Sequence, residues 1–376
     1  MPWRVPGAEP DERERTRMNT GSGQPDLDQR SHEALRIIVQ EHVRSGQPVS
    51  SRRVAALHPE ALSSATIRNL MAELTDAGLL AQPHTSAGRV PTDHGYRQVV
   101  NEVLGRKRRV SRRDARRIED LLFSSRKIDD LLSRAGKLLS AMTHQVGLVL
   151  APDLEQALLE YVEFVRIAPQ RFVAIFVSRA GLITHRVFNA DEDIHQEELD
   201  HLSARLREQF TGLTLPETRQ RMIEALQEDR RWALQLGQMA TESVISYLRQ
   251  PFPEESGELI VEGASSLLDA PEFADLERLR EVMVALEERT KLLKLLDRCL
   301  SASGVQVIIG GESADPDFAP VSLVASPYRM GELMKGLVGI VGPRRMEYAR
   351  AVALVDHFAR TLSLALGGHE EEEEKH

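Results

Sequence analysis

The first hundred residues carry apolar positions at helical spacing, interrupted by short polar segments. Over 28–44, apolar side chains recur every three or four positions, which predicts an amphipathic helix. Gly46 ends it, because glycine tolerates the left-handed conformation common at helix C-termini. A short second helix is predicted from a cap at Ser50 or Ser51 to Leu57.

A third helix is predicted between a cap at Ser63 or Ser64 and Gly78. Its buried stripe consists of Ile67, Leu70, Met71 and Leu74. Two strand-length apolar segments follow, at 79–82 and at Val90. A fourth helix begins just after them, at a cap formed by Thr92 or Asp93.

Three short helices followed by two short strands are the element order of a winged helix-turn-helix. In that motif the third helix enters the major groove of DNA, and the β-hairpin forms a wing against the sugar–phosphate backbone. Within the hairpin, Pro83 ends the first strand, Ala87-Gly88 supplies a tight turn and Arg89 is expected at the tip. The alternative is an ordinary surface loop.

The rest of the chain alternates between helical and strand-like patterns. The segment 106–144 is predicted as a linker helix, and strand-like runs begin near Val146. One of these runs, FVAIFV, has no polar residue and is predicted to be a central strand buried on both faces. A polar helical block occupies 192–256, and strands and helices then return up to 366. We therefore predict one α+β domain interrupted by a helical insertion. A separate all-helical domain is the alternative.

Charge is distributed unevenly along the chain. Residues 28–117 hold sixteen Lys and Arg against nine Asp and Glu, a net charge of +7, whereas the whole chain carries −9. A basic segment on an acidic body indicates a nucleic-acid module, with chance clustering as the alternative. The arginine-rich run at 106–117 has two interpretations, the solvated face of a linker helix or a contact to phosphate.

Composition narrows the class of protein further. A single cysteine, Cys299, excludes a disulfide framework and fits a reducing cytoplasm. No apolar run approaches the ~18 residues of a membrane span. The polar, Pro/Gly-rich residues 1–27 are predicted to be a disordered leader, and 367–376 an acidic tail.

The chemistry of the third helix favours DNA reading. Arg binds guanine and Asn binds adenine through paired hydrogen bonds, and hydroxyls at a helix N-terminus suit a phosphate. The alternative is the exposed face of any small helix. The residues predicted to read DNA are Ser63, Ser64, Thr66, Arg68, Asn69 and Glu73.

Two further groups are predicted to contact the DNA backbone. Those of the wing are His84, Thr85, Ser86, Gly88 and Arg89. Those beside the second and fourth helices are Arg52, Arg53, Tyr96 and Arg97, as phosphate contacts.

Enzyme chemistry is poorly represented in the sequence. No zinc-protease, P-loop, dinucleotide-binding or nucleophile-elbow motif occurs. The acidic cluster at 191–201 contains His, Asp and Glu, but acidic residues at a helix start are explained by the helix dipole. We expect no enzyme activity, no cofactor and no metal.

Three stretches resemble one known family. SSATIRNLMAELTDAGLLAQPHTSAGRVPTDHGYR (63–97) resembles the signature of the heat-inducible transcription repressor HrcA of bacteria. GQPVSSRRVA (46–55) and PVSLVASPYRMGELMKGLVGIVGPRRMEYARAVALV (320–355) match further blocks of that family. Two positions depart from its pattern: Ser50 stands where glycine is expected and Leu70 where an acidic residue is expected. The first is predicted to alter the turn before the second helix, the second to alter packing.

This resemblance implies a multidomain α+β fold: a winged helix-turn-helix, a GAF-like domain and a helical dimerisation domain inserted within it. The implied ranges are 28–105 for the winged helix, 106–144 for the linker helix, 145–191 and 257–366 for the GAF-like domain, and 192–256 for the insertion. It also implies a cytoplasmic homodimer that binds an inverted-repeat operator of chaperone genes as double-stranded DNA. The GroEL chaperonin would keep it active, heat would release repression, and no membrane would be involved. The alternatives are a regulator whose GAF-like domain senses a small molecule, and a protein-interaction scaffold.

Overall fold

The computed structural model divides into two compact units, Met1–Val99 and Val100–His376, each considered by itself. Residues 27–366 are described, except 85–86, 107–108, 125–127, 153–155, 180–182, 190–192, 215, 219, 222–257, 314 and 332–333. The predicted leader, apart from its last residue, and the acidic tail therefore lie outside the described residues, as does most of the predicted insertion.

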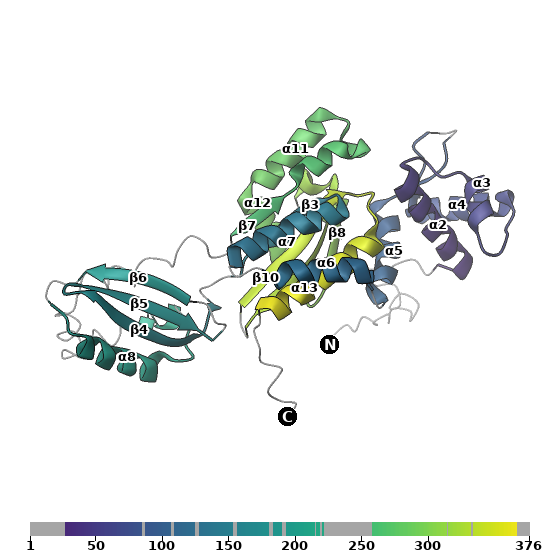
Figure 1. The fold of residues 1–376 in the computed structure, drawn as a ribbon. Helices are drawn as coiled ribbons and strands as arrows, with labels where there is room; N and C mark the ends of the chain where they lie inside the picture. Colours follow the sequence, from purple (N-terminus) through teal and green to yellow (C-terminus); the bar gives the residue numbers. More distant parts are fainter. Residues whose placement is uncertain are drawn as a thin grey trace, which may run out of the picture. The chain divides into compact units, whose positions relative to one another are not determined.

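The first unit contains three helices and a two-stranded hairpin (Figure 1). The helices are α2 (Gln29–Ser45), α3 (Ser51–Leu57) and α4 (Ser64–Asp76), and the strands are β1 (Leu80–Ala81) and β2 (Val90–Pro91). The fourth predicted helix, α5 (Asp93–Gly105), follows directly and crosses the boundary between the units.

Short polar residues set the helix ends as the sequence predicted. Asp28, Ser50 and Ser63 each cap the helix that follows them, accepting a backbone N–H with the side chain. Gly46 closes α2 in the left-handed conformation, at φ 67°. Ser50 has an ordinary extended backbone at φ −85°, so serine in place of the expected glycine is accommodated and adds a cap.

The second unit is built on a five-stranded antiparallel sheet with the order β7-β3-β10-β9-β8. These strands are β3 (Val146–Leu150), β7 (Leu259–Glu262), β8 (Gln306–Ile309), β9 (Val321–Met330) and β10 (Met334–Pro343). Strands that are far apart in the sequence pair in this sheet. Val149 of β3, for example, lies opposite Ile260 of β7. The strands at either end of the second unit therefore share one sheet, as predicted.

Helices cover both faces of this sheet (Figure 1). On one face lie α6 (Arg112–Leu122), α7 (Ile128–Thr143) and α13 (Tyr348–Leu366). On the other, α11 (Leu276–Glu287) and α12 (Arg289–Leu300) pack against the sheet and bury Cys299. Short 3₁₀ turns η2 to η5 complete this layer, at Ala264–Asp269, Pro271–Phe273, Gly310–Glu312 and Pro316–Phe318.

The prediction of a linker helix at 106–144 is wrong. The structure has two helices there, α6 and α7, which contact each other and α13. Their buried residues, among them Ile118, Leu122 and Leu139, belong to the core of the second unit. Apolar residues on one face commit a helix to packing, so these helices form a layer on the sheet.

A second correction concerns the strands between 159 and 189. They form a separate antiparallel sheet of β4 (Leu159–Ala168), β5 (Arg171–Ser178) and β6 (Ile183–Asn189), with the order β4-β5-β6. The prediction that assigned them to the GAF-like sheet was wrong. Helix α8 (Gln196–Phe210) packs against β4. Within the sheet, Phe172 lies edge-to-face with Phe164 and stacked on Phe188.

Strand β5, which contains FVAIFV, is central in its sheet, as predicted, but it is not buried on both faces. Phe172 and Ala174 are buried on one face, whereas Val173, Ile175 and Val177 on the opposite face are only half-buried. The described segment around the predicted insertion is thus a mixed sheet-and-helix subdomain, whose strands precede residue 192.

Candidate nucleic-acid interface

Helix α4 has one buried and one exposed face. Ile67, Leu70, Met71 and Leu74 form the buried stripe, including Leu70, whose packing role was predicted. The exposed face carries Thr66, Arg68, Asn69 and Glu73. Within the described residues, the Arg68 and Asn69 side chains make no hydrogen bond or ion pair. Their donors and acceptors are therefore free to meet a partner molecule.

The hydroxyls at the start of α4 are partly used inside the protein. Ser63 Oγ accepts the Thr66 N–H at 3.1 Å and lies 2.9 Å from Thr66 Oγ1. Ser64 Oγ lies 3.0 Å from Ser51 Oγ, at the start of α3. This contact brings the first turns of α3 and α4 together, so the exposed Arg52 and Thr66 come from neighbouring helix starts.

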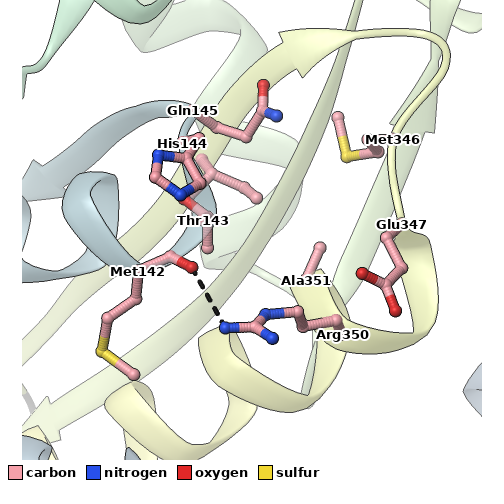
Figure 2. A pocket seen from close by; sticks show the side chains of 9 residues that line it. Met142, Thr143, His144, Gln145, Met346, Glu347, Arg350 and Ala351 are labelled. Carbon is pink, nitrogen blue, oxygen red and sulfur yellow. Dashed lines mark hydrogen bonds between the residues drawn. The ribbon is translucent and has the colours of Figure 1, made fainter. Parts of the chain in front are cut away.

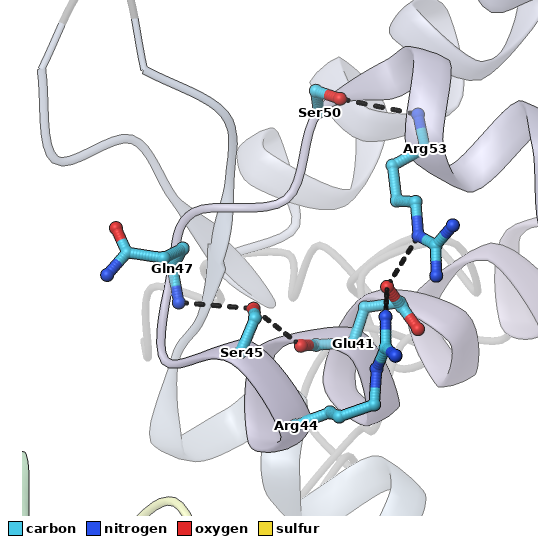
Figure 3. Close-up of polar contacts among 6 residues, drawn as sticks. All are labelled: Glu41, Arg44, Ser45, Gln47, Ser50 and Arg53. Atoms are coloured by element: carbon cyan, nitrogen blue, oxygen red, sulfur yellow. Dashed lines mark hydrogen bonds and ion pairs between the residues drawn. The ribbon is translucent and has the colours of Figure 1, made fainter.

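Arg53 is held by a carboxylate that sequence reasoning missed. Glu41 Oε2, on α2, accepts from Arg53 Nε at 2.6 Å and from Arg44 Nη2 at 3.0 Å (Figure 3). The hydrogen bond from Arg53 is the main cause that lowers the pKa of Glu41 below its ordinary value. Arg53 therefore links α2 to α3, whereas Arg52 has no such tether within the described chain.

The prediction that Arg89 lies at the tip of the hairpin is also wrong. Arg89 lies at its base, where its backbone N–H and C=O both pair with Val49. Its Nε donates to Thr75 Oγ1 of α4 at 3.0 Å. The turn comes before Arg89 in the chain, where the Ala87 N–H donates to the carbonyl of His84. His84 is exposed there, and Thr85 and Ser86 lie outside the described residues.

Gly88 has a packing role beside this bridge. A Cβ at this position would overlap the carbonyl oxygen of Val49, so no larger residue allows the two backbones to pair this closely. Gly95 is equally confined, because a Cβ there would overlap the carbonyl oxygen of Leu79. Gly88 thus holds the hairpin against the segment between α2 and α3, and Gly95 allows α5 to lie close to Leu79.

The prediction that Tyr96 contacts phosphate is wrong. Tyr96 is only 4% exposed and belongs to the core. The sequence could have indicated this, because Tyr96 and Val100 stand at i and i+4, the spacing of one helix face. The structure buries both side chains. Arg97 is half-buried on the adjacent part of α5. Thr92 caps the start of this helix, accepting the Gly95 N–H at 3.2 Å, as predicted.

The described part of the second unit offers a pocket but no arrangement typical of catalysis. A cavity of about 250 Å³ lies where α7 ends and α13 begins (Figure 2). Its polar lining includes His144, Gln145, Glu347 and Arg350, and Arg350 Nη2 donates to the Met142 carbonyl at 3.4 Å. Among the described residues, no group of three or more His, Cys, Asp or Glu side chains is placed to hold a metal. Burial raises the pKa of the Cys299 thiol to about 11, which keeps it protonated and unreactive.

Comparison with known proteins places these observations in a family. The model of the HrcA protein C-terminal domain matches residues 129–352. The heat-inducible transcription repressor HrcA of Syntrophobacter fumaroxidans is 35% identical over 342 residues, which is 91% of this chain and 98% of that protein. The protein of the same name from Geobacter sulfurreducens is 35% identical over 344 residues, covering 91% and 99%.

A solved structure has a related fold. A crystal structure of a hypothetical protein has a TM-score of 0.60 at 24% identity, over 91% of this chain and 99% of that one. No helix in the described part of the chain has the length and apolar character needed to cross a membrane. The extent of these sequence matches shows that the chain belongs to the HrcA family.

Proposed function

We propose that this protein is a transcription repressor whose first unit is a winged helix that binds double-stranded DNA. The observation that carries the proposal is the exposed face of α4, where Arg68 and Asn69 are without partners in the described chain. Both side chains suit paired hydrogen bonds to base edges in the major groove. The curated relatives carry the name heat-inducible transcription repressor, which supports the same role.

The hairpin acts as the wing in this proposal. The Nε of Arg89 donates to Thr75, while its Nη groups make no hydrogen bond or ion pair within the described residues. A guanidinium fixed at one nitrogen is suited to meet a phosphate with the others. His84, and Thr85 and Ser86 by their place in the sequence, lie nearer the turn and are proposed as further backbone contacts.

Arg52 is proposed as a phosphate contact from the start of α3, because it is exposed and lacks an ion pair within the described residues. Arg97 is proposed in the same role from α5. Arg53 contributes positive charge from its place beside Glu41.

We propose that two copies bind an inverted-repeat operator together, since a two-fold site requires a two-fold protein. The sheet β4-β5-β6 offers a surface for a second copy on the face opposite Phe172. It exposes large apolar side chains on both outer strands: Val165 and Ile167 on β4, and Ile183 and Val187 on β6. Contiguous exposed apolar residues on a sheet mark an interaction site.

The second unit is proposed to be GAF-like and non-enzymatic, with a role in regulation in the cytoplasm. The GroEL chaperonin is proposed to maintain the active fold, and heat to relieve repression as unfolded clients occupy the chaperonin. A change of one or two kcal/mol in stability alters the folded fraction several-fold, so a repressor of marginal stability responds steeply to temperature.

Operator binding with and without GroEL, at a growth and a heat-stress temperature, tests this proposal. We expect tight binding of the inverted repeat, loss of binding at the higher temperature and recovery with GroEL and ATP. Equal binding to the inverted repeat and to random duplex would overturn the DNA-reading role. If GroEL did not restore the binding that is lost at the higher temperature, only the chaperonin role would be overturned.

The cavity between α7 and α13 favours a second candidate function, a repressor controlled by a small molecule. Its Arg350 and His144 side chains suit a small anionic ligand. A metabolite extract that changes operator affinity in the wild-type protein, but not in an Arg350→Ala variant, would favour this function.

A further inference from the structure

Helix α6 combines a buried apolar stripe with a strongly basic outer face. Ile118 and Leu122 are buried in the second unit, at 0% and 1% exposure. The charged groups on the opposite side of its first two turns are all exposed arginines, and one more exposed arginine stands three positions before the helix. These residues are Arg109, Arg112, Arg113, Arg116 and Arg117. These five residues are called the α6 arginines below.

The α6 arginines have no carboxylate partner among the described residues. Several other arginines of the chain behave differently. Each of the following is paired with a carboxylate three or four positions earlier: Arg36 with Glu33, Arg44 with Glu41, Arg106 with Glu102, Arg134 with Asp130 and Arg360 with Asp356. The α6 arginines thus form a cluster of positive charge that no carboxylate of the described chain neutralises.

This arrangement is unfavourable for α6 by itself. Arg112 and Arg116, and likewise Arg113 and Arg117, stand at i and i+4, where like charges destabilise a helix by roughly 0.2–0.5 kcal/mol per pair. The order of charges along the helix adds to this effect. Apart from Asp114 in the first turn, the charged residues of the N-terminal half are arginines, whereas Glu119 and Asp120 follow near the C-terminus, which is the reverse of what the helix dipole favours. Charge held against both effects is best accounted for by an external polyanion.

We infer that the α6 arginines bind the phosphate backbone of the DNA duplex that the first unit reads, an inference that rests on the proposed function. Arginine is suited to phosphate because its planar donors match two phosphate oxygens. The contacts would add affinity without reading sequence, since phosphates are the same at every base pair. This surface is separate from α4 and from the hairpin.

A short segment of chain joins α5 to α6. Helix α5 begins in the first unit, where Tyr96 is buried, and ends at Gly105. Six residues separate Gly105 from Arg112, so their Cα atoms are at most about 25 Å apart along the fully extended chain. The start of α6 is therefore tied by a short segment to a helix that begins in the first unit.

The salt dependence of DNA binding by the full-length protein tests this inference. The test variant is Arg112→Gln with Arg116→Gln, and the control variant is Arg134→Gln with Arg360→Gln, which removes two exposed but paired arginines. Affinity is measured over a range of salt concentrations, on the inverted repeat and on a random duplex. The slope of log K against log salt concentration falls by about 0.9 for each phosphate that the protein no longer neutralises.

We expect the test variant to flatten the slope on both duplexes and to lose affinity at low salt, with the preference for the inverted repeat unchanged. The control variant retains the wild-type slope. Equal slopes in the test variant and the wild type would overturn the inference. If the wild type itself bound the inverted repeat and the random duplex equally, the proposed function would be contradicted. The salt slope on the random duplex would still decide the role of α6.

A second measurement separates DNA from the chain's own acidic tail as the occupant of α6. The same comparison is made in a chain that ends at Gly368 and so lacks the glutamates Glu370 to Glu374. If DNA contacts α6 directly, the slope difference between test variant and parent persists without the tail. If the difference disappears, the tail is the partner of α6 and the inference is overturned.

Discussion

Arg89 Nε donates to Thr75 Oγ1 at 3.0 Å and so ties the base of the hairpin to the last turns of α4. Thr75 itself donates to the Met71 carbonyl at 2.7 Å, which fixes the direction of its hydroxyl. The guanidinium is thereby held at one nitrogen, with its remaining donors available for a phosphate. The hairpin and α4 are thus coupled through two side chains.

This coupling separates charge from position in a pair of variants. We expect Arg89→Ala to weaken binding to all duplexes and to flatten the salt slope by about 0.9 for a single phosphate left without its cation. We expect Thr75→Val to weaken binding with the slope retained, because the charge remains but its orientation is lost. Fluorescence anisotropy over a salt series measures both. If Arg89→Ala changed the preferred base, the hairpin would be reading sequence.

Arg68 and Asn69 are expected to supply sequence preference. Arg68→Ala and Asn69→Ala should each reduce the preference for the inverted repeat over random DNA by about 1–3 kcal/mol, which is the range of one paired base contact. A competition gel shift measures the ratio directly. Arg360→Ala, which removes an exposed arginine on α13, is the control and should keep the ratio. Unchanged preference in both α4 variants would remove α4 from the reading role.

Gly88→Ala is expected to destabilise the hairpin. The new Cβ would overlap the Val49 carbonyl oxygen, and relieving such overlap costs roughly 1–3 kcal/mol. Gly105→Ala is the matched control, since a Cβ at the end of α5 meets nothing within 4 Å. Hydrogen exchange at Val49 and Arg89 should accelerate only in Gly88→Ala. Equal protection in both variants would show that the hairpin accommodates the methyl group.

The link between Glu41 and Arg53 is expected to depend on pH. Folding lowers the pKa of Glu41, so its stabilising effect is complete above the ordinary glutamate pKa of roughly 4.3 and is lost as pH falls through the lower folded value. Glu41→Gln removes this dependence. The readout is the protection of α3 amides, corrected for intrinsic exchange, in wild type and variant. The difference between them should shrink as pH falls through that window, and a constant difference would contradict it.

Local features of the fold could be predicted because their causes are local. Caps at Ser50 and Ser63 and the buried stripe of α4 follow from residues within one or two turns. Sheet membership depends on distant partners, such as the pairing of Val149 with Ile260. A strand pattern alone therefore did not reveal that β4, β5 and β6 form a sheet of their own.

The site shows the same division. The exposed residues of α4 follow from its periodicity. The position of Arg89 does not, because a bridge to Val49, forty residues earlier, sets where the hairpin begins. Glu41 was missed for the same reason, since its partner Arg53 is on another helix.

The face of β4-β5-β6 opposite Phe172 is expected to hold the proposed dimer together. Deleting 192–256 is a poor test, because it removes α8, which packs against β4. Ile183→Lys with Val187→Lys places charge on the proposed interface while leaving the aromatic cluster of Phe164, Phe172 and Phe188 intact. Ile183 is 67% and Val187 45% exposed, so neither substitution disturbs a core.

Leu276→Lys is the matched control, because Leu276 is 76% exposed on α11 and lies outside this sheet. Light scattering should give a monomer for the double variant and a dimer for the control. The double variant should also bind the full inverted repeat with an affinity close to that for a single half-site, since the second copy no longer adds its contacts. A double variant that remains a dimer would place the interface on another surface of the chain.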